Sequence, residues 1–256
     1  MRISTSTSLA CILALAAITH GQSAAAPTEP GTPEETRLLL RSGSLEQRQK
    51  IAHLLNLSEP WEHGKLCVEY ENVELSKPTL KAGSESALLT TTSSDCDFAF
   101  LVPFISTGHG WILAGTVPVW TKYSSPKYRI ESLTTPGESE IIVSGQTVDS
   151  GTGILQRNLT ILKIVGDSIR IIFDQPEEIN LSVPVKVRGE RTNTREEESS
   201  AFSFVNSEPF MPGLKGIQET RVLRIAGQLI TIHRKYVWTP SISMFRMYGT
   251  GPPDSE

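Results

Sequence analysis

The sequence has few of the residues on which catalysis and metal binding most often depend. Only five of its 256 residues are histidine and only three are cysteine. No serine lies in a Gly-x-Ser-x-Gly motif, and neither a His-x-x-x-His pair nor the spacing of an EF-hand loop occurs. These shortages argue against a serine or cysteine hydrolase, and we expect neither a metal site nor a cofactor.

Long apolar runs and a surplus of basic charge are also missing. The longest apolar run, residues 9–18, is about half of the ~20 residues that a helix needs to span a bilayer, so no transmembrane segment is predicted. The chain has 24 Lys and Arg against 28 Asp and Glu, a net charge of -4. This balance argues against nucleic acid as a partner, because nucleic-acid-binding domains usually carry a basic surface. The 38% of hydrophobic residues is enough for a folded core.

The first 26 residues have the three parts of a secretory signal peptide. Arg2 supplies positive charge, residues 9–18 are the apolar segment, and residues 24–26 are an Ala-Ala-Ala cleavage site. We therefore predict a soluble protein that is secreted or periplasmic, cleaved after Ala26. A lipoprotein anchored at Cys11 is the alternative, but the apolar run continues past that cysteine.

Two cysteines remain after this cleavage, Cys67 and Cys96. An even number of cysteines in an oxidising compartment predicts a disulfide. It would close a loop of about 30 residues and stabilise the fold by roughly 3 to 4 kcal/mol on the chain-entropy model.

Residues 27–60 are predicted to form a leader and a short helical pair. Thr32, Pro33 and Glu35 have the pattern of a capping box with proline at the first helical position, and Ser44 and Gln47 repeat the box. We expect the pair to cover an open sheet edge or the end of a barrel.

From residue 61 the hydrophobic period changes to two, which indicates strands. The clearest hairpin spans residues 154–174 and turns at Gly166, and similar hairpins span residues 98–120 and 220–238. Sequential short strands favour antiparallel pairing. The predicted fold class is mainly β: one antiparallel meander domain over residues 61–248, a sandwich or a barrel, divisible into three weakly similar four-stranded units.

Several individual segments are predicted from the same pattern. Strands are expected at residues 66–70, 111–120 and 181–187, among others. The polar segment 188–200 is expected to be a surface loop, and residues 249–256 a flexible tail.

The last hairpin is the most suggestive surface. Residues 214–246 hold six basic residues and one acidic residue, Glu219, in an otherwise acidic chain, together with several aromatic rings. We predict a surface for a polysaccharide or an anionic envelope component, made by Arg221, Arg224, Arg234, Lys235, Tyr236 and Trp238. The alternatives are that the charges pair with neighbours such as residues 196–198 and that the rings pack in the core.

These observations favour a non-catalytic binding module or a protein associated with the cell envelope. One alternative is a carboxylate-based extracellular hydrolase resembling a glycosidase in mechanism, for which Asp97, Asp174, Glu177 and Glu178 could supply the pair of acids. Another is a structural or assembly protein that pairs with a second protein through exposed strands.

Overall fold

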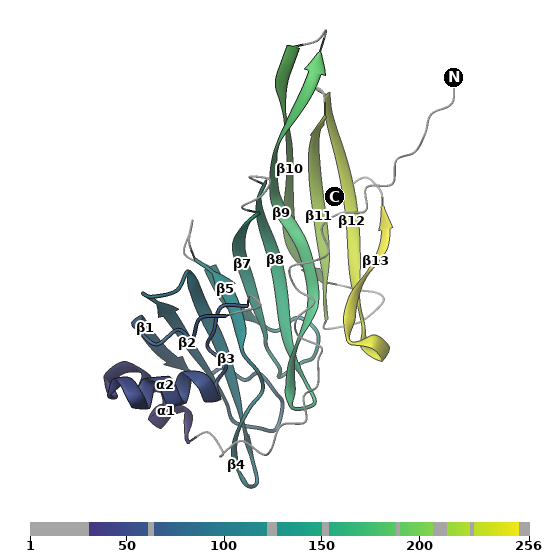
Figure 1. Ribbon diagram of the computed structural model, residues 1–256. Coiled ribbons are helices and arrows are strands. Elements are labelled where there is room, and N and C mark those ends of the chain that lie inside the picture. The colour runs from purple at the N-terminus through teal and green to yellow at the C-terminus, as the bar shows by residue number, and fades with distance from the viewer. Residues whose placement is uncertain are drawn as a thin grey trace.

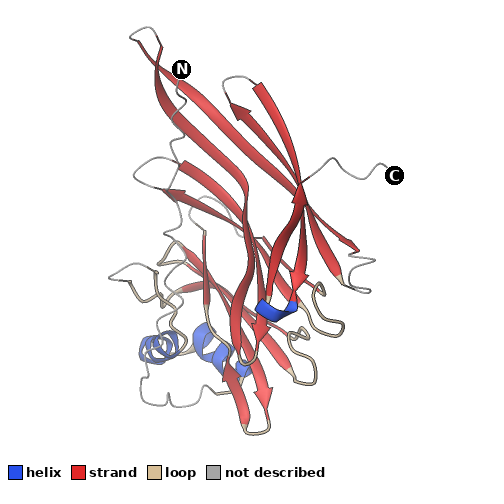
Figure 2. Ribbon diagram, turned by 90° about the vertical axis from the view of Figure 1, so that its right-hand side faces the viewer, coloured by secondary structure: helices blue, strands red, loops and turns tan. Residues whose placement is uncertain are grey.

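The computed structural model describes residues 31–60, 64–121, 127–149, 154–187, 190–206, 214–225 and 228–250. Two helices are followed by thirteen strands in two antiparallel sheets (Figure 1). The two α-helices lie at one side of the molecule, apart from a short 3-10 helix, Pro240–Ile242, between the last two strands (Figure 2). The predicted mainly β, antiparallel fold with an N-terminal helical pair is confirmed. The predicted signal peptide lies outside the described residues.

The helical pair begins where its capping boxes were predicted. In α1 (Pro33–Ser42) the Thr32 hydroxyl accepts from the Glu35 N–H, and the Glu35 carboxylate accepts from the Thr32 N–H at 2.9 Å. In α2 (Leu45–Leu54) Ser44 and Gln47 make the same reciprocal bonds. These bonds satisfy N–H groups that the first helical turn leaves without partners, which fixes both helix starts. Neither helix is long and apolar enough to cross a membrane, and the same holds for every other helix in the described ranges.

Sheet 1 contains five strands in the order β1-β2-β3-β4, with β5 also paired to β3. Their bounds are β1 (Tyr70–Ser76), β2 (Ser86–Ser93), β3 (Phe98–Thr107), β4 (Gly110–Leu113) and β5 (Val117–Trp120). The strand predicted at residues 66–70 is wrong in position, because pairing with β2 begins at Tyr70. The strand predicted at 111–120 is broken, because Gly115 has a φ of +137° and redirects the chain, so that β4 and β5 pair with different ends of β3.

Sheet 2 is an eight-stranded meander in which every strand pairs with its neighbours in the chain. Its strands are β6 (Lys127–Glu131), β7 (Glu140–Asp149), β8 (Ile154–Val165), β9 (Ser168–Val187), β10 (Glu190–Asn206), β11 (Lys215–Ile225), β12 (Gln228–Thr239) and β13 (Met244–Thr250). The central predicted hairpin is β8–β9. The segment predicted as a separate strand at 181–187 is the end of β9.

The polar segment 188–200 was predicted to be a surface loop. That prediction is wrong for residues 190–200. These residues belong to β10, whose register with β9 runs from Glu190–Val187 to Ser199–Glu178. Backbone pairing supplies the hydrogen bonds whether or not the side chains are apolar, so a polar sequence can form a strand beside a partner already in place. The ends of β9 and β10 project beyond the neighbouring strands at the top of Figure 1. Similarly, Gly249 and Thr250 belong to β13, and residues 251–256 lie outside the described part.

The two sheets stay open and pack face to face, so the sandwich alternative holds and the barrel does not. Leu88 and Leu101 of sheet 1 meet Ile141 and Leu162 of sheet 2 in the core between the sheets. A second core lies between the helices and sheet 1, and a third lies on the far side of sheet 2. The last two predicted four-stranded units share one continuous sheet and are not separate modules.

The third core exists because sheet 2 curls. Phe173 of β9 lies 5.0 Å from the ring of Tyr236 on β12 and 6.0 Å from the ring of Phe245 on β13, both in edge-to-face geometry. Strands three and four positions apart in the sheet therefore touch across its concave side.

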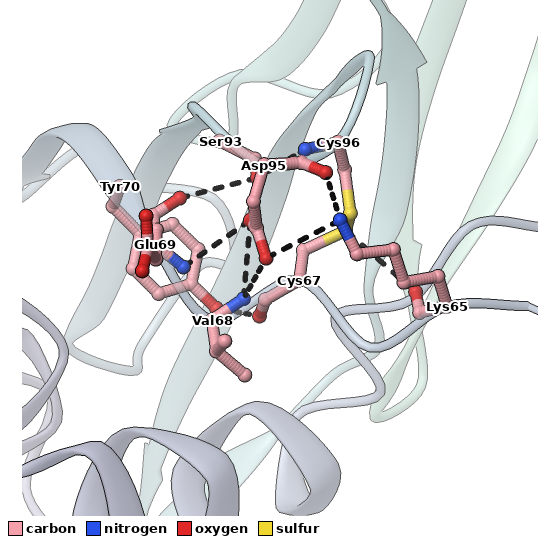
Figure 3. A network of polar contacts seen from close by, with 8 residues as sticks. All are labelled: Lys65, Cys67, Val68, Glu69, Tyr70, Ser93, Asp95 and Cys96. Atoms are coloured by element: carbon pink, nitrogen blue, oxygen red, sulfur yellow. Dashed lines mark hydrogen bonds and ion pairs between the residues drawn. A yellow bond between two sulfur atoms is a disulfide. The ribbon is translucent and has the colours of Figure 1, made fainter.

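The predicted disulfide joins Cys67 and Cys96, whose Cα atoms are 5.8 Å apart (Figure 3). Beside it, the Asp95 carboxylate accepts from the N–H groups of Val68 and Glu69 and, at 2.7 Å, from the Ser93 hydroxyl. Partial burial raises the pKa of Asp95, but the Ser93 and backbone donors outweigh it, and the net pKa is lowered. This network fixes the chain where it enters β1.

Candidate functional site

The six residues predicted as a ligand surface lie on β11 and β12, and the strand register divides them between two faces. Glu219 pairs with Arg234 across the strands, and alternate positions along each strand turn the same way. We call the concave face of sheet 2, which carries Phe173, the inner face. The opposite face is the outer face, and at β7 and β8 it packs against sheet 1. The inner face has Arg221, Arg234, Tyr236 and Trp238, and the outer face has Arg224 and Lys235.

A buried carboxylate, Glu219, organises the inner face. It is 1% exposed and accepts hydrogen bonds from the Tyr236 hydroxyl at 2.6 Å and the Ser200 hydroxyl at 2.7 Å. Arg234 forms an ion pair with it at 3.5 Å. Burial, reinforced by the bond to Glu219, raises the pKa of Tyr236 to about 12. Tyr236 is therefore a neutral donor at physiological pH, held by an internal acceptor.

The other inner-face residues are also held by internal contacts. Arg221 forms an ion pair with Glu198 of β10, one of the acids in the segment weighed as an alternative partner. Trp238 is 6% exposed and packs against Phe245 with ring centroids 5.6 Å apart. The alternatives of charge pairing and core packing thus describe the inner face. As a ligand surface, the full set of six stays a prediction.

Every charged residue on the outer face of β11–β13 is basic. Arg224 and Arg246 are exposed, and neither forms an ion pair with a side chain in the described part of the chain. The strand register places Glu197 of β10 directly opposite Arg224. Arg246 of β13 pairs through its backbone with Val237 of β12, two residues from Lys235, so Arg246 and Lys235 lie on the same face. β12 and β13 contain no acidic residue. His233 lies on this face as well, 3.3 Å from the Thr220 hydroxyl.

Sequence reasoning missed Arg246 as part of this surface. It also grouped residues that face opposite ways, although a signal for the division was present. Arg221 and Arg224 are an odd number of positions apart, and so are Arg234 and Lys235. In a regular strand, an odd spacing puts two side chains on opposite faces.

The four carboxylates predicted for a hydrolase do not all lie on one surface. Asp174 accepts from Thr160 at 2.8 Å and from Asn158 at 3.2 Å, and its burial raises its pKa. Glu177 accepts from Ser144. Val143 lies on the outer face, in the core between the sheets, so its neighbour Ser144 lies on the inner face. Thr160 pairs with Val143, so Thr160 and the Asp174 carboxylate bonded to it lie on the outer face. Asp174 and Glu177 therefore face opposite sides of sheet 2.

Of the two remaining acids, one directly follows Glu177 in β9 and the other lies just before β3. Glu178 forms an ion pair with Arg157 at 3.3 Å, and Asp97 precedes β3 in sheet 1. The sites of these four acids therefore include two faces of sheet 2 and the start of a strand in sheet 1.

A second buried charge cluster was not predicted from the sequence. Lys163 of β8 donates to Glu138 at 2.6 Å and to the fully buried Glu140 at 2.9 Å. Glu140 also accepts from the Leu133 N–H and the Thr134 hydroxyl. These bonds hold the connection between β6 and β7 in place, so this buried charge cluster has a structural role.

No group of three or more His, Cys, Asp or Glu that could hold a metal ion occurs within the described ranges. No known protein-family model matches the chain, and neither a curated protein nor a solved structure is similar enough to count as a match.

Proposed function

We propose that the protein is a non-catalytic binding module that holds an anionic polymer against the outer face of β11–β13. The observation that supports this is the sorting of charge across sheet 2. On the inner face, Arg234 and Arg221 pair with Glu219 and Glu198. On the outer face, Arg224 and Arg246 are exposed and form no ion pair with a described side chain, and Glu197 of β10 lies opposite Arg224 in the strand register.

The spacing of these charges suits an extended ligand better than a compact one. Arg224 pairs with Leu229, which lies six positions from Lys235 on β12, a separation of about 20 Å along the strand. Lys235 and Arg246 lie on adjacent strands near the other end. Thr220, Thr231 and Gln218 add neutral hydrogen-bonding groups on the same face. An acidic polysaccharide or another anionic envelope polymer has charges repeated over such a length, and local positive potential attracts it despite the acidic net charge.

The predicted signal peptide would bring the module to such a polymer outside the cytosol. This part of the proposal is tested by sequencing the N-terminus of the exported protein. A mature chain that begins at Pro27 supports it, and an uncleaved chain retained in the cytosol contradicts it.

The binding test compares two charge-reversed double variants. Calorimetry with heparin or polygalacturonate at low and moderate salt should show binding that weakens with salt. Arg224→Glu with Arg246→Glu should bind roughly tenfold more weakly, because two attractive contacts become repulsive. The matched control, Lys50→Glu with Lys77→Glu, makes the same change in net charge at exposed positions elsewhere. Equal losses in both double variants, or no binding to either polymer, would contradict the proposal.

A further inference from the structure

A groove of about 600 Å³ lies between α1 and β1, at the opposite end of the molecule from the outer face of β11–β13. One wall is a single side of α1, formed by Glu34, Arg37 and Arg41. The other wall is the consecutive run 70–75, nearly the whole of β1. Neighbouring residues of a strand point to opposite faces, so a groove lined by six in succession follows the edge of the strand.

That edge is open. β1 is the end strand of sheet 1 and pairs with β2 on its other side, and no further strand pairs with it among the described residues (Figure 1). An edge strand presents N–H and C=O groups to whatever enters the groove. An open strand edge beside a helix is the arrangement in which an extended peptide adds to a sheet through backbone hydrogen bonds.

The groove is held in shape before anything binds. The Asp95 network and the disulfide fix the chain just before Tyr70, whose hydroxyl donates to the Cys67 carbonyl (Figure 3). On the other wall, the Thr32 capping box fixes the start of α1, and Leu40 is buried in the core beneath it. A preformed site lowers the entropy lost on binding.

The side chains beside the edge select the chemistry of the added strand. Val73 is buried on the helix side, and Leu75 packs on the same core. Asn72 and Glu74 lie on the other side, where the Asn72 amide donates to the Glu74 carboxylate. Glu71 is exposed at the bulge between Tyr70 and Asn72. An added strand would place apolar residues beside Val73 and Leu75. At alternate positions it would place basic residues beside the two glutamates, on the side of the strand that faces away from the arginines of α1.

A second copy of β1 does not fit this pattern. β1 contains two glutamates and no basic residue. Pairing two such strands brings like charges close together, which is unfavourable.

We propose that the groove between α1 and β1 binds an extended polypeptide segment with alternating apolar and basic residues, as an added strand of sheet 1. This is a polypeptide site, separate in place and in ligand charge from the surface for an anionic polymer.

The probe is a blocked seven-residue peptide of alternating valine and lysine, matching the seven residues of β1. The control peptide has glutamate in place of lysine. Fluorescence anisotropy should show that the lysine peptide binds at least ~10-fold more tightly than the glutamate peptide. Hydrogen exchange of the wild-type protein with the lysine peptide should slow at amides of β1.

Glu74→Lys should weaken binding of the lysine peptide roughly tenfold and strengthen binding of the glutamate peptide. The matched control Glu46→Lys reverses the same charge at an exposed position of α2 outside the groove, and it should leave both affinities unchanged. The exchange measurement on the wild-type protein needs no variant, so it decides the matter even if Glu74→Lys fails to fold.

Four outcomes would overturn the proposal. These are equal affinity for the two peptides, equal effects of Glu74→Lys and Glu46→Lys, protection of another edge such as β13 instead of β1, and a peptide-free protein that dimerises through β1. Loss of polymer binding in the Arg224 and Arg246 double variant would bear only on the outer face of β11–β13.

Discussion

At the scale of single residues, two aspartates show that the surroundings of a carboxylate decide whether it stabilises the fold. Asp95 is partly buried, which raises its pKa, but hydrogen bonds from Ser93 and two backbone N–H groups lower it further than burial raises it. For Asp174, burial is the larger effect, and bonds from Thr160 and Asn158 offset only part of it. The pKa of Asp95 is lowered and that of Asp174 is raised, so ionisation favours the folded state at the first and opposes it at the second.

Substitution by asparagine should therefore have opposite effects at the two positions. At pH 7, Asp95→Asn should lower the free energy of unfolding, and Asp174→Asn should raise it. The contribution of Asp95 is present above its ordinary pKa of 3.8 and is lost as the pH falls through its lower folded value. The penalty at Asp174 is present above its raised folded pKa and disappears below 3.8. Urea unfolding from pH 7 to pH 3 should show both differences shrinking, and effects of the same sign at pH 7 would contradict this account.

The hydroxyl of Tyr236 should contribute to stability in addition to the packing of its ring. Tyr236→Phe leaves the buried Glu219 without its shortest hydrogen bond, which should cost about 1 to 3 kcal/mol in urea unfolding. Because the folded pKa is about 12, above the ordinary value of 10, this stabilisation is fully present below pH 10 and is lost between pH 10 and 12. Tyr128→Phe is the matched control, since Tyr128 is 40% exposed, and it should change stability by less than ~0.5 kcal/mol. Similar effects of the two substitutions would mean that the Glu219 network is not stabilising.

At the scale of elements, strands with local signals were predictable and strands defined by their partners were not. The β8–β9 hairpin has apolar arms around Gly166 and was found, and the capped helices were found in the same way. β1 and the first part of β10, residues 190–200, were missed, because Glu71 and Glu74 in one and a run of polar residues in the other conceal the alternation. Both are strands because β2, β9 and β11 offer them backbone partners.

The break between β4 and β5 should be sensitive to a single methyl group. A Cβ at Gly115 would lie 2.8 Å from Cγ2 of Ile169 on β9, and the φ of +137° disfavours any other residue. Gly83 also has a positive φ but nothing within 4 Å of its Cβ position. Gly83→Ala should cost about 1 to 2 kcal/mol through backbone strain, and Gly115→Ala should cost at least ~1 kcal/mol more through overpacking. Thermal unfolding measures both, and equal costs would show that the contact with Ile169 is relieved without penalty.

At the scale of the whole molecule, three apolar layers in succession join the helices, sheet 1 and the curled sheet 2. Leu162 lies in the layer between the sheets and is 1% exposed, so it contacts both halves of the fold. The carbonyl of Ala114, in the connection between β4 and β5, also accepts a hydrogen bond from the Ile169 N–H of β9 at 2.8 Å. We therefore expect the two sheets to unfold together.

Leu162→Ala should lower the free energy of unfolding by about 2 to 5 kcal/mol. Leu229→Ala makes the same chemical change at a position that is 64% exposed, and it should cost less than ~0.5 kcal/mol. Tryptophan fluorescence reports on Trp111 and Trp120 in sheet 1, on Trp238 in sheet 2, and on Trp61, which lies outside the described residues. Its transition should coincide with that of circular dichroism. Two separated transitions would show that the sheets are independent.

Three features of the fold follow from residues close together in the chain or from the pair of cysteines, and they were predictable without a structure. These are the two capping boxes, the antiparallel hairpins and the disulfide between Cys67 and Cys96. Only the tertiary structure decided which face each basic residue occupies, which acids neutralise Arg221 and Arg234, and which edge of sheet 1 stays open. Register, curl and sheet order decide these features, because they bring together residues that lie far apart in the chain.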